Sequence, residues 1–436
     1  MKTTEFEDLN YQCGLEELYP GELGLKIDKT SLRSIILIIC KLFYYSLKSL
    51  NPFVKKLNFP RGIDTLVVIS SLNQYRALDK LIQSIPNTLV LSTFPVDNCN
   101  NIIIDTRGNC WASVFNLPKL LKLLFSKKGF QYKSILYHFY DYLNTPGVYI
   151  RAFDYIKEIK PKSLLIANDH TFITRSYFRA SQQLGVKTIY TQHASVSNLF
   201  PALEFDYAFL DGEETLNKYR HNGRPIMTDV FLSGSPRFDK IPLIPEVNIY
   251  DLGLAINMLD NKDKVLSFVK KLSENKINFI VRPHPGQVDI MFWEKYCKQN
   301  NIAYSNPHID NPISFIASCN RFAVGDSALH LEVALCKKIS YYVNFQNNEP
   351  SDCYDYLKEG LVKIKSEKDI VDILTGRIND EISIDKVKYY VANFESEYWG
   401  KSTKLIFETI KQINTNEKIS LWESRMKEER IFEIKS

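Results

Sequence analysis

Residues 279–285 read Phe-Ile-Val-Arg-Pro-His-Pro, and Gly286 follows them. An apolar run that ends in prolines and a glycine is typical of a buried strand that enters a rigid loop. Proline fixes φ and removes a backbone donor, so the flanking prolines hold His284 in a defined pose. In α/β proteins, ligands bind outside the carboxyl ends of the strands. The stretch therefore predicts a ligand site at Arg282 and His284, and the alternative is a proline-terminated strand with a chance histidine.

Short apolar runs alternate with helical periodicity along most of the chain. This alternation predicts parallel sheets covered by helices on both faces. Segment 238–247 holds two prolines and no periodicity, so we interpret it as an interdomain linker or an in-domain loop. We predict an α/β fold with two Rossmann-like domains facing a central cleft. The predicted strands are 65–70, 88–92, 101–105, 163–167, 187–191, 205–210 and 230–233, then 248–256, 278–282, 321–325 and 339–343.

The length of 436 residues also favours two domains over one. Four segments are predicted along the chain. They are an N-terminal extension with an apolar helix at 1–60, a Rossmann-like domain at 61–240, a second one at 241–382, and C-terminal helices at 383–436.

The composition is that of an ordinary globular protein, with 45% hydrophobic and 24% charged residues. The net charge of +5 is mild, and no basic run with interleaved aromatics predicts a nucleic-acid partner. The charge is compatible with a phosphate-bearing ligand or an anionic membrane surface. The eight cysteines form no Cys-x-x-Cys pair, so neither a zinc site nor a redox motif is predicted. A reducing cytoplasm fits this cysteine usage best.

Segment 31–48 is strongly apolar but its uncharged run, 34–40, is interrupted by Lys41. A membrane-spanning helix needs about 20 apolar residues, so we reject a span. The simplest interpretation is a buried helix. The alternative is a basic interfacial helix, with Lys41, Lys48, Lys55 and Lys56 near lipid headgroups on the inner face of the plasma membrane.

A second candidate site lies at the strand that ends in Val324. The chain turns through Gly325 into a helix that we expect to begin near Ser327. Helix N-termini present free backbone N–H groups, which suit phosphate. Ser327 can cap this helix or donate to a phosphate oxygen. Glu332 is polar on an otherwise apolar helix, so it is predicted to bind a ribose hydroxyl or to lie on a solvated face.

The first half offers candidates for a catalytic base at three strand ends. His193 follows one predicted strand, and histidine titrates near neutral pH, which suits proton transfer. Asp211 follows another strand and can serve as base itself or orient His193. Asp169 and His170 are weaker candidates.

Several enzyme classes are disfavoured by missing motifs. The sequence contains neither the Gly-x-x-x-x-Gly-Lys-Ser/Thr motif of P-loop NTPases nor the Gly-x-Gly-x-x-Gly motif of dehydrogenases. The sequence also lacks the Gly-x-Ser-x-Gly elbow of α/β-hydrolases. The lack of an Asp-x-Asp pair leans away from metal-dependent sugar transferases, so no metal site is predicted.

An ordered set of motifs over residues 185–345 resembles two-domain transferases of the GT-B fold. The similar proteins are bacterial enzymes of capsule, lipopolysaccharide and teichoic-acid synthesis, namely CDP-glycerol glycerophosphotransferases, Kdo transferases, and sialyl- and polysialyltransferases. UDP-N-acetylglucosamine 2-epimerases share the fold and the Gly-x-Pro-Arg-x-Asp turn. The motifs are Gln192-His193, then Gly234-Ser235-Pro236-Arg237-Phe238-Asp239, then Arg282-Pro283-His284-Pro285, then Gly325-Asp326-Ser327 with Glu332.

The resemblance implies roles for these residues. In the C-terminal domain, His284 and Ser327 would contact the donor phosphate and Glu332 the ribose. His193 matches the glycerophosphotransferase histidine, although Gln192 and Ala194 replace the family's aromatic and glycine neighbours. The donor-binding set implied by the resemblance is Arg282, His284, Ser327, Glu332, Ser235 and Arg237.

Asp211 and Gly212 are similar to part of the acidic-acidic-glycine motif of sialyltransferases, although Leu210 stands in the place of the first acid. The base is therefore left open between His193 and Asp211.

The resemblance implies a metal-independent glycosyltransferase of bacterial surface-polysaccharide synthesis. The nucleotide-activated donor, expected to be a CMP-linked acidic sugar such as sialic acid or Kdo, would bind the C-terminal domain. A glycan or lipid-linked acceptor would bind the N-terminal domain, and no separate cofactor is expected. The alternatives are a CDP-glycerol-type glycerophosphotransferase, a UDP-sugar 2-epimerase-like isomerase, and a non-catalytic assembly scaffold.

Overall fold

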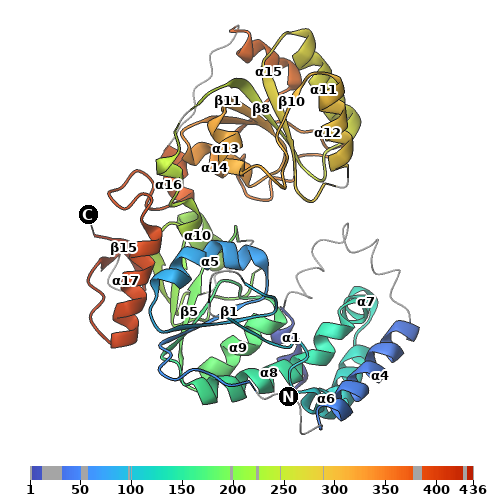
Figure 1. Ribbon diagram of the computed structural model, residues 1–436, viewed down its shortest axis with the longest axis vertical. Helices are drawn as coiled ribbons and strands as arrows, with labels where there is room; N and C mark the ends of the chain where they lie inside the picture. Colours follow the sequence, from blue (N-terminus) through green and yellow to red (C-terminus); the bar gives the residue numbers. More distant parts are fainter. Residues whose placement is uncertain are drawn as a thin grey trace. The chain divides into compact units, whose positions relative to one another are not determined.

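The computed structural model divides the chain into two compact units (Figure 1). Unit 1 comprises Met1–Leu210, Leu216–Arg237 and Thr403–Ser436, and unit 2 comprises Asp211–Thr215 and Phe238–Ser402. The structure describes residues 2–11, 32–50, 57–96, 99, 101–196, 200–221, 225–245, 247–287, 289–376, 385–425 and 430–435.

Unit 1 is built on a sheet whose strand order is β14-β15-β7-β6-β5-β4-β1-β2-β3 in the described residues. All neighbours pair in parallel except β14 and β15. The central strands are buried along almost their whole length, which explains the apolar runs Leu66–Ile69 of β1 and Leu164–Ile166 of β4. The strands are β1 Thr65–Ile69, β2 Thr88–Ser92, β3 Asn101–Ile103, β4 Ser163–Ile166, β5 Lys187–Thr191, β6 Tyr207–Leu210, β7 Asp229–Leu232, β14 Trp422–Ser424 and β15 Ile431–Ile434.

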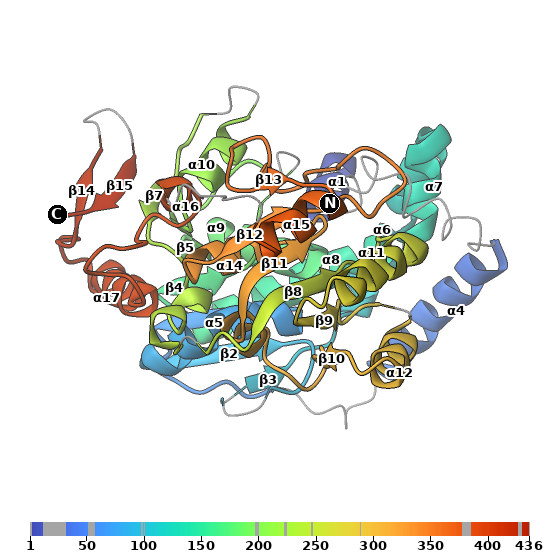
Figure 2. The same cartoon turned by 90° about the horizontal axis from the view of Figure 1, so that it is seen from above.

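Helices of unit 1 surround this sheet and form a separate layer beside it (Figures 1 and 2). Several of these helices have a side-chain N-cap. Ser71 accepts a hydrogen bond from the backbone N–H of Gln74, and Asn109 accepts one from the backbone N–H of Ala112. The helices are α1 Thr3–Leu9, α4 Leu32–Lys48, α5 Leu72–Ser84, α6 Cys110–Ser126, α7 Gly129–Tyr137, α8 Phe139–Ile159, α9 Phe172–Gln183, α10 Glu213–Arg220, whose first turn is assigned to unit 2, and α17 Ser402–Thr415, which begins at the last residue of unit 2.

The predicted N-terminal extension is part of unit 1. Phe6 of α1 is fully buried in an apolar cluster that includes residues of α6 and α8. Asp8 accepts hydrogen bonds from Arg175 and Arg179 of α9, and Thr145 bonds Asn10. These contacts attach α1 to the helices that cover the sheet.

The predicted apolar helix is α4, Leu32–Lys48. One face of it is buried, where Ile35 and Leu42 pack in the same cluster as Phe6. The opposite face is exposed, so α4 combines features of the buried and the interfacial interpretations. Lys55 and Lys56 lie outside the described residues. Across the described ranges, no helix combines the length and the apolar character that crossing a bilayer requires.

Unit 2 holds a fully parallel sheet of order β10-β9-β8-β11-β12-β13 among the described residues (Figure 2). The strands are β8 Tyr250–Ile256, β9 Phe279–Pro283, β10 Ala303–Tyr304, β11 Cys319–Val324, β12 Ile339–Tyr342 and β13 Lys363–Ile364. The helices are α11 Lys262–Glu274, α12 Ile290–Gln299, α13 Pro312–Ala317, α14 Leu329–Leu335, α15 Glu367–Leu374 and α16 Asp385–Tyr390.

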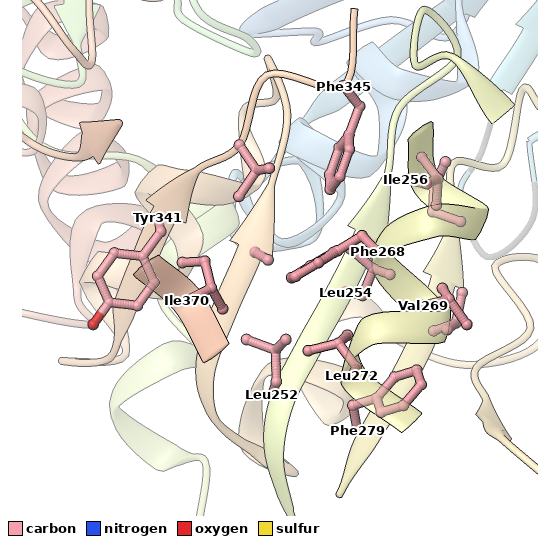
Figure 3. Packing of buried hydrophobic residues seen from close by; sticks show 14 of the residues in the cluster. Leu252, Leu254, Ile256, Phe268, Val269, Leu272, Phe279, Tyr341, Phe345 and Ile370 are labelled. Atoms are coloured by element: carbon pink, nitrogen blue, oxygen red, sulfur yellow. The ribbon is translucent and has the colours of Figure 1, made fainter. Parts of the chain in front are cut away.

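One core of unit 2 lies between the sheet and the helices α11, α12 and α15. Leu252 and Leu254 of β8 pack there against Phe268 and Leu272 of α11 (Figure 3). The two parallel sheets with covering helices confirm the predicted α/β fold class.

The C-terminal segment differs from the prediction of helices alone. Within 383–436, α16 is assigned to unit 2, whereas α17 lies almost entirely in unit 1 and is followed by β14 and β15. β15 pairs in parallel with β7, and Trp422 of β14 donates from Nε1 to Thr409 of α17 at 2.8 Å. The partner strand lies about two hundred residues earlier in the chain, so local periodicity carried no signal of this pairing.

Segment 238–247, interpreted as a linker or an in-domain loop, begins at a boundary between the two units and is folded into turns in its described residues. It contains the last residue of one 3₁₀ turn, Pro236–Phe238, and all of another, Ile241–Leu243. Phe238 and Ile241 are buried in a second apolar cluster of unit 2.

Truncating the core of unit 2 should destabilise it strongly. Leu254 is fully buried, so Leu254→Ala should lower the free energy of unfolding by about 3 kcal/mol, since it removes buried methyl groups and leaves a cavity. The same change at Leu243, which is 80% exposed, is the matched control and should cost under about 0.5 kcal/mol. Urea denaturation followed by tryptophan fluorescence measures both. Equal midpoints for the two variants would contradict this core assignment.

Candidate functional site

The two candidate sites of unit 2 lie at one edge of its sheet. β8 runs between β9 and β11, and all three are parallel, so the loops after them leave from the same edge. The loop after β8 contacts both neighbours. The backbone N–H of His284 donates to the carbonyl of Ile256 at 2.8 Å, and the Asn257 amide donates to the carbonyl of Asp326. β9 and β11 are therefore two strand spacings apart, or about 10 Å.

His284 is exposed and its ring is oriented by the following glycine. The backbone N–H of Gly286 donates to Nδ1 of His284 at 3.0 Å. Because Nδ1 is the acceptor, the proton of the neutral ring lies on Nε2, which remains a donor. Partial burial lowers the pKa of His284, which favours this neutral form. A Cβ at position 286 would lie 2.6 Å from the sulfur of Met258, so a larger residue there would displace the Met258 side chain.

Arg282 is buried and its guanidinium is used inside unit 2. Nη1 donates to Oγ of Ser305 at 2.6 Å, and Nη2 donates to the carbonyl of Asp310 at 3.0 Å. Burial lowers the pKa of Arg282, and the charges of Asp310 and Glu332 act in the opposite direction. The structure therefore brings Glu332 into electrostatic contact with Arg282, and Arg282 ties β9 to the loop that follows β10.

Ser327 lies just before the helix predicted at this point. α14 begins at Leu329, two residues later than predicted, and Oγ of Ser327 accepts from the Leu329 N–H at 3.2 Å. On the same helix, His330 is fully buried, and the sequence analysis did not single it out. Its Nε2 lies 3.0 Å from the carbonyl of Gly325, and its Nδ1 lies 2.8 Å from Oγ of Ser340.

A carbonyl only accepts, so His330 donates from Nε2 and accepts at Nδ1. Burial lowers the pKa of His330 to about 4, so the ring is neutral at pH 7. Both ring nitrogens are used, which fixes the turn at Gly325 and gives His330 a positioning role.

Asp260 is another residue that the sequence analysis missed. It is 9% exposed, and its Oδ2 accepts from the backbone N–H of Asn257 at 2.7 Å. Its Oδ1 has no hydrogen-bond partner among the described residues. Burial, together with the nearby charge of Asp326, raises the pKa of Asp260 to about 7. A Cβ at Gly325 would lie 2.8 Å from Oδ1, so this carboxyl also requires the glycine of the β11 turn.

The signal for Asp260 was available in principle. It lies four residues after the end of β8, and the rule applied to the ends of β9 and β11 applies to β8 as well. Its burial, however, depends on Gly325 and Asp326, which are far away in the sequence.

In unit 1, adjacent parallel strands bring the ends of β4 and β5 together. Asp169 is buried after β4, and its carboxylate lies 2.9 Å from Nδ1 of His170 and accepts from the Tyr219 hydroxyl at 2.9 Å. His170 also contacts Nδ2 of Asn168 through Nε2, at 3.1 Å. Because the carboxylate accepts and the amide nitrogen donates, both nitrogens of His170 are used.

His193 follows β5 and differs from His170 in this respect. Its ring hydrogen-bonds the backbone of Ala167, and its Nδ1 is buried with no partner among the described residues. Burial and the nearby His170 lower the pKa of His193 to about 4, and Arg237 lowers it further, against attraction from Asp169. The ring is therefore neutral at pH 7, with an unused acceptor nitrogen.

The other predicted residues of the first half occupy the next strand ends. β6 and β7 continue the sheet beside β5, so Asp211, Ser235 and Arg237 follow strands that end at the edge where His193 lies. Ser235 is buried, and its hydroxyl has no partner among the described residues.

Asp211 is buried and is assigned to unit 2, where its carbonyl accepts from the N–H of Ala392 at 2.8 Å. Asp239, the last residue of the Gly-x-Pro-Arg-x-Asp turn, accepts from the N–H of Ser402 at 2.8 Å and so holds the first residue of α17.

The carboxyl of Asp260 should make stability depend on pH. Its pKa is raised from the model-compound value of 3.8 to about 7, so the folded state holds its proton more tightly than the unfolded state. This contribution to stability is lost as pH rises from about 4 to about 7. Asp260→Asn lacks the titration, so its stability relative to the native protein should rise by about 2 kcal/mol between pH 5 and pH 7.

The measurement is urea denaturation at both pH values, in which the histidine titrations cancel between variant and native protein. Asp251→Asn, at an exposed position of the same strand β8, is the control and should show no such change. A pH-independent difference for Asp260→Asn would show that the carboxyl titrates normally.

No protein-family model matches the sequence, and no curated protein matches it either. Among solved structures, the UDP-GlcNAc 2-epimerase of Neisseria meningitidis, bound to UDP-GlcNAc, matches with a TM-score of 0.51 at 14% identity, covering 80% of this chain and 100% of that chain. The wall teichoic acid polymerase TagF matches with a TM-score of 0.50 at 9% identity, covering 90% of this chain and 98% of that chain.

Identities this low establish a common fold rather than a common activity. Both matches span most of this chain and nearly all of the other, so the likeness includes both Rossmann-like sheets. The chain therefore has a GT-B-like α/β fold built from two Rossmann-like domains.

Proposed function

We propose that this protein is a glycosyltransferase that moves a sugar from a nucleotide-activated donor to a hydroxyl of a glycan or lipid-linked acceptor. Its donor would be a CMP-linked acidic sugar, and its product a bacterial surface polysaccharide. The observation that carries the proposal is the state of His193. This ring is neutral and half-buried, and its buried Nδ1 is an unused acceptor at the end of a central parallel strand.

His193 is the favoured base because its competitors are engaged elsewhere. His170 uses both nitrogens in contacts with Asp169 and Asn168. A neutral imidazole with a free Nδ1 can accept a proton from a hydroxyl as the oxygen attacks. Asp169 opposes the effect of burial on the His193 pKa, so it would stabilise the imidazolium that forms. Asp211 remains the second candidate for the base.

In the transfer step, the acceptor oxygen would form a bond to the anomeric carbon while its proton passes to Nδ1 of His193. The bond from that carbon to the donor phosphate would break, and the nucleotide would leave with the electron pair. His284 would donate from Nε2 to the departing phosphate, since its Nδ1 is already an acceptor. Ser327 would contact the same phosphate, and Glu332 the ribose.

The predicted donor-binding cations differ in role. The guanidinium of Arg282 is committed to Ser305 and Asp310, so Arg282 would act by positioning the loop that carries His284. Arg237 acts electrostatically on His193, and with Ser235 it would contribute to the binding of an anionic group in unit 1.

Replacing the base should abolish turnover without unfolding the protein. We expect His193→Gln to lower kcat by about 100-fold or more, since a general base contributes at least that much. The control is His308→Gln, an exposed histidine of unit 2. Nucleotide release from CMP-sialic acid and CMP-Kdo measures both, with a mixed surface-glycan acceptor, and melting temperatures confirm folding. Full activity of His193→Gln would refute the assignment, and the same loss in Asp211→Asn alone would transfer the role to Asp211.

The bound nucleotide should reveal the donor class. A ligand at about 100 times its Kd stabilises the folded state by about 2.7 kcal/mol, which corresponds to several degrees in melting temperature. We expect CMP to raise the melting temperature more than UDP does, and His284→Ala to reduce the shift while His308→Ala leaves it unchanged.

A larger shift with UDP would contradict the CMP-linked donor. Conversion of a UDP-sugar without an acceptor would identify an isomerase, and no shift with CMP, CDP or UDP would favour the non-catalytic alternative.

A further inference from the structure

The exposed face of α4 carries apolar side chains from Ile36 to Leu47. Its most exposed apolar side chains are Ile36, Leu37, Phe43, Tyr44 and Leu47, of which Tyr44 is 60% and Leu47 63% exposed. At 100° per residue, these side chains form one continuous stripe opposite the buried Ile35 and Leu42. An uninterrupted apolar stripe of this size on a protein surface indicates a binding surface.

Cations border this stripe on one side. Lys41 and Lys48 lie next to Leu37 and Tyr44 around the helix, and both lysines are exposed. Together, segments 32–48 and 110–137, which form α4, α6 and α7, contain eight lysines and arginines and no aspartate or glutamate. Since the whole chain has a net charge of +5, the remainder carries −3. The positive charge of the protein is therefore concentrated on the helices around this stripe.

The neighbouring helix α6 repeats the combination of aromatic and basic residues. Phe115, Lys119, Lys122 and Phe125 are all exposed, and their spacing places them on one face of α6. α4 packs against α6 through the cluster that contains Ile35, Leu42 and Leu120. The two helices lie side by side (Figure 1) and present basic and apolar side chains to solvent.

A cavity of about 450 Å³ adjoins the basic border of α4. Lys41, Tyr45 and Arg107 are among its lining residues. Arg107 is ion-paired with Asp105 and lies over the ring of Tyr45, whereas Lys41 has no ion pair within the described part of the chain. The cavity thus offers an uncompensated ammonium group next to the apolar stripe, where a phosphate can bind.

We propose that this α4–α6 surface docks on a membrane of anionic phospholipids. The apolar stripe would enter the headgroup boundary, the lysines would attract the anionic surface, and the cavity at Lys41 would take the phosphate of one lipid. A second copy of the chain is a poorer occupant, because a two-fold interface would bring the same cations against one another.

Vesicle sedimentation with the full chain tests the proposal. We expect binding to vesicles of phosphatidylcholine with one-third phosphatidylglycerol, and little binding to phosphatidylcholine alone. Binding should weaken between about 0.1 M and about 1 M salt, because the charges are exposed and screened. No binding to anionic vesicles, or equal binding to both kinds, would overturn the proposal.

Two pairs of variants locate the surface. Leu47→Glu should lower the partition coefficient about tenfold. Leu243→Glu, at a more exposed leucine of unit 2, should leave it unchanged. Replacing Lys41, Lys48, Lys119 and Lys122 by glutamine should have a similar effect. Four exposed lysines of unit 2 changed in the same way, Lys270, Lys295, Lys298 and Lys368, provide a control of equal net charge.

If both variants of a pair lose binding equally, the effect is one of net charge or folding and the docking surface is wrong. A dimer in light scattering that Leu47→Glu dissociates, without vesicle binding, would instead assign the surface to a second copy of the chain and overturn the lipid assignment.

Discussion

Parallel strand pairing is the constraint on which both candidate sites depend. In unit 2, β8 lies between β9 and β11, and in unit 1, β5 lies between β4 and β6. Loops that leave such strands emerge at one edge, where their backbone groups no longer have strand partners. The bonds from His284 to Ile256 and from Asn257 to Asp326 satisfy those groups and fix the loops relative to the sheet.

The histidines at these sheet edges differ in which ring nitrogen is left without a hydrogen-bond partner among the described residues. His193, His284 and His330 all have lowered pKa values, so each is neutral at pH 7. His330 uses both nitrogens and holds a turn. His284 accepts at Nδ1 and can donate from Nε2, whereas His193 has an unused acceptor at Nδ1. One residue type thus supplies a support, a hydrogen-bond donor and a proton acceptor, according to its neighbours.

The sequence predicted the strands and helices that are marked by a local pattern of apolar residues. Strands such as β1 and β9 are buried on both faces, so each contains an apolar run, Leu66–Ile69 in β1 and Phe279–Val281 in β9. β14 and β15 were missed because they are short, lie near the chain end, and are held through β7, a strand far away in the sequence. Asp260 was missed for a similar reason, since a carboxylate beside Gly325 has a raised pKa only once β8 and β11 are neighbours.

The amino-acid order alone specified which polar residues follow which strands, because an apolar run and the proline or glycine that ends it are local properties of the chain. Tertiary structure decided which of those residues keep an unused group. The Arg282 guanidinium hydrogen-bonds Ser305, and the His170 ring hydrogen-bonds Asp169. Nδ1 of His193 has no hydrogen-bond partner among the described residues. The reason is physical: a hydrogen bond or a desolvated charge depends on partners that folding brings together from distant segments, and no local pattern encodes them.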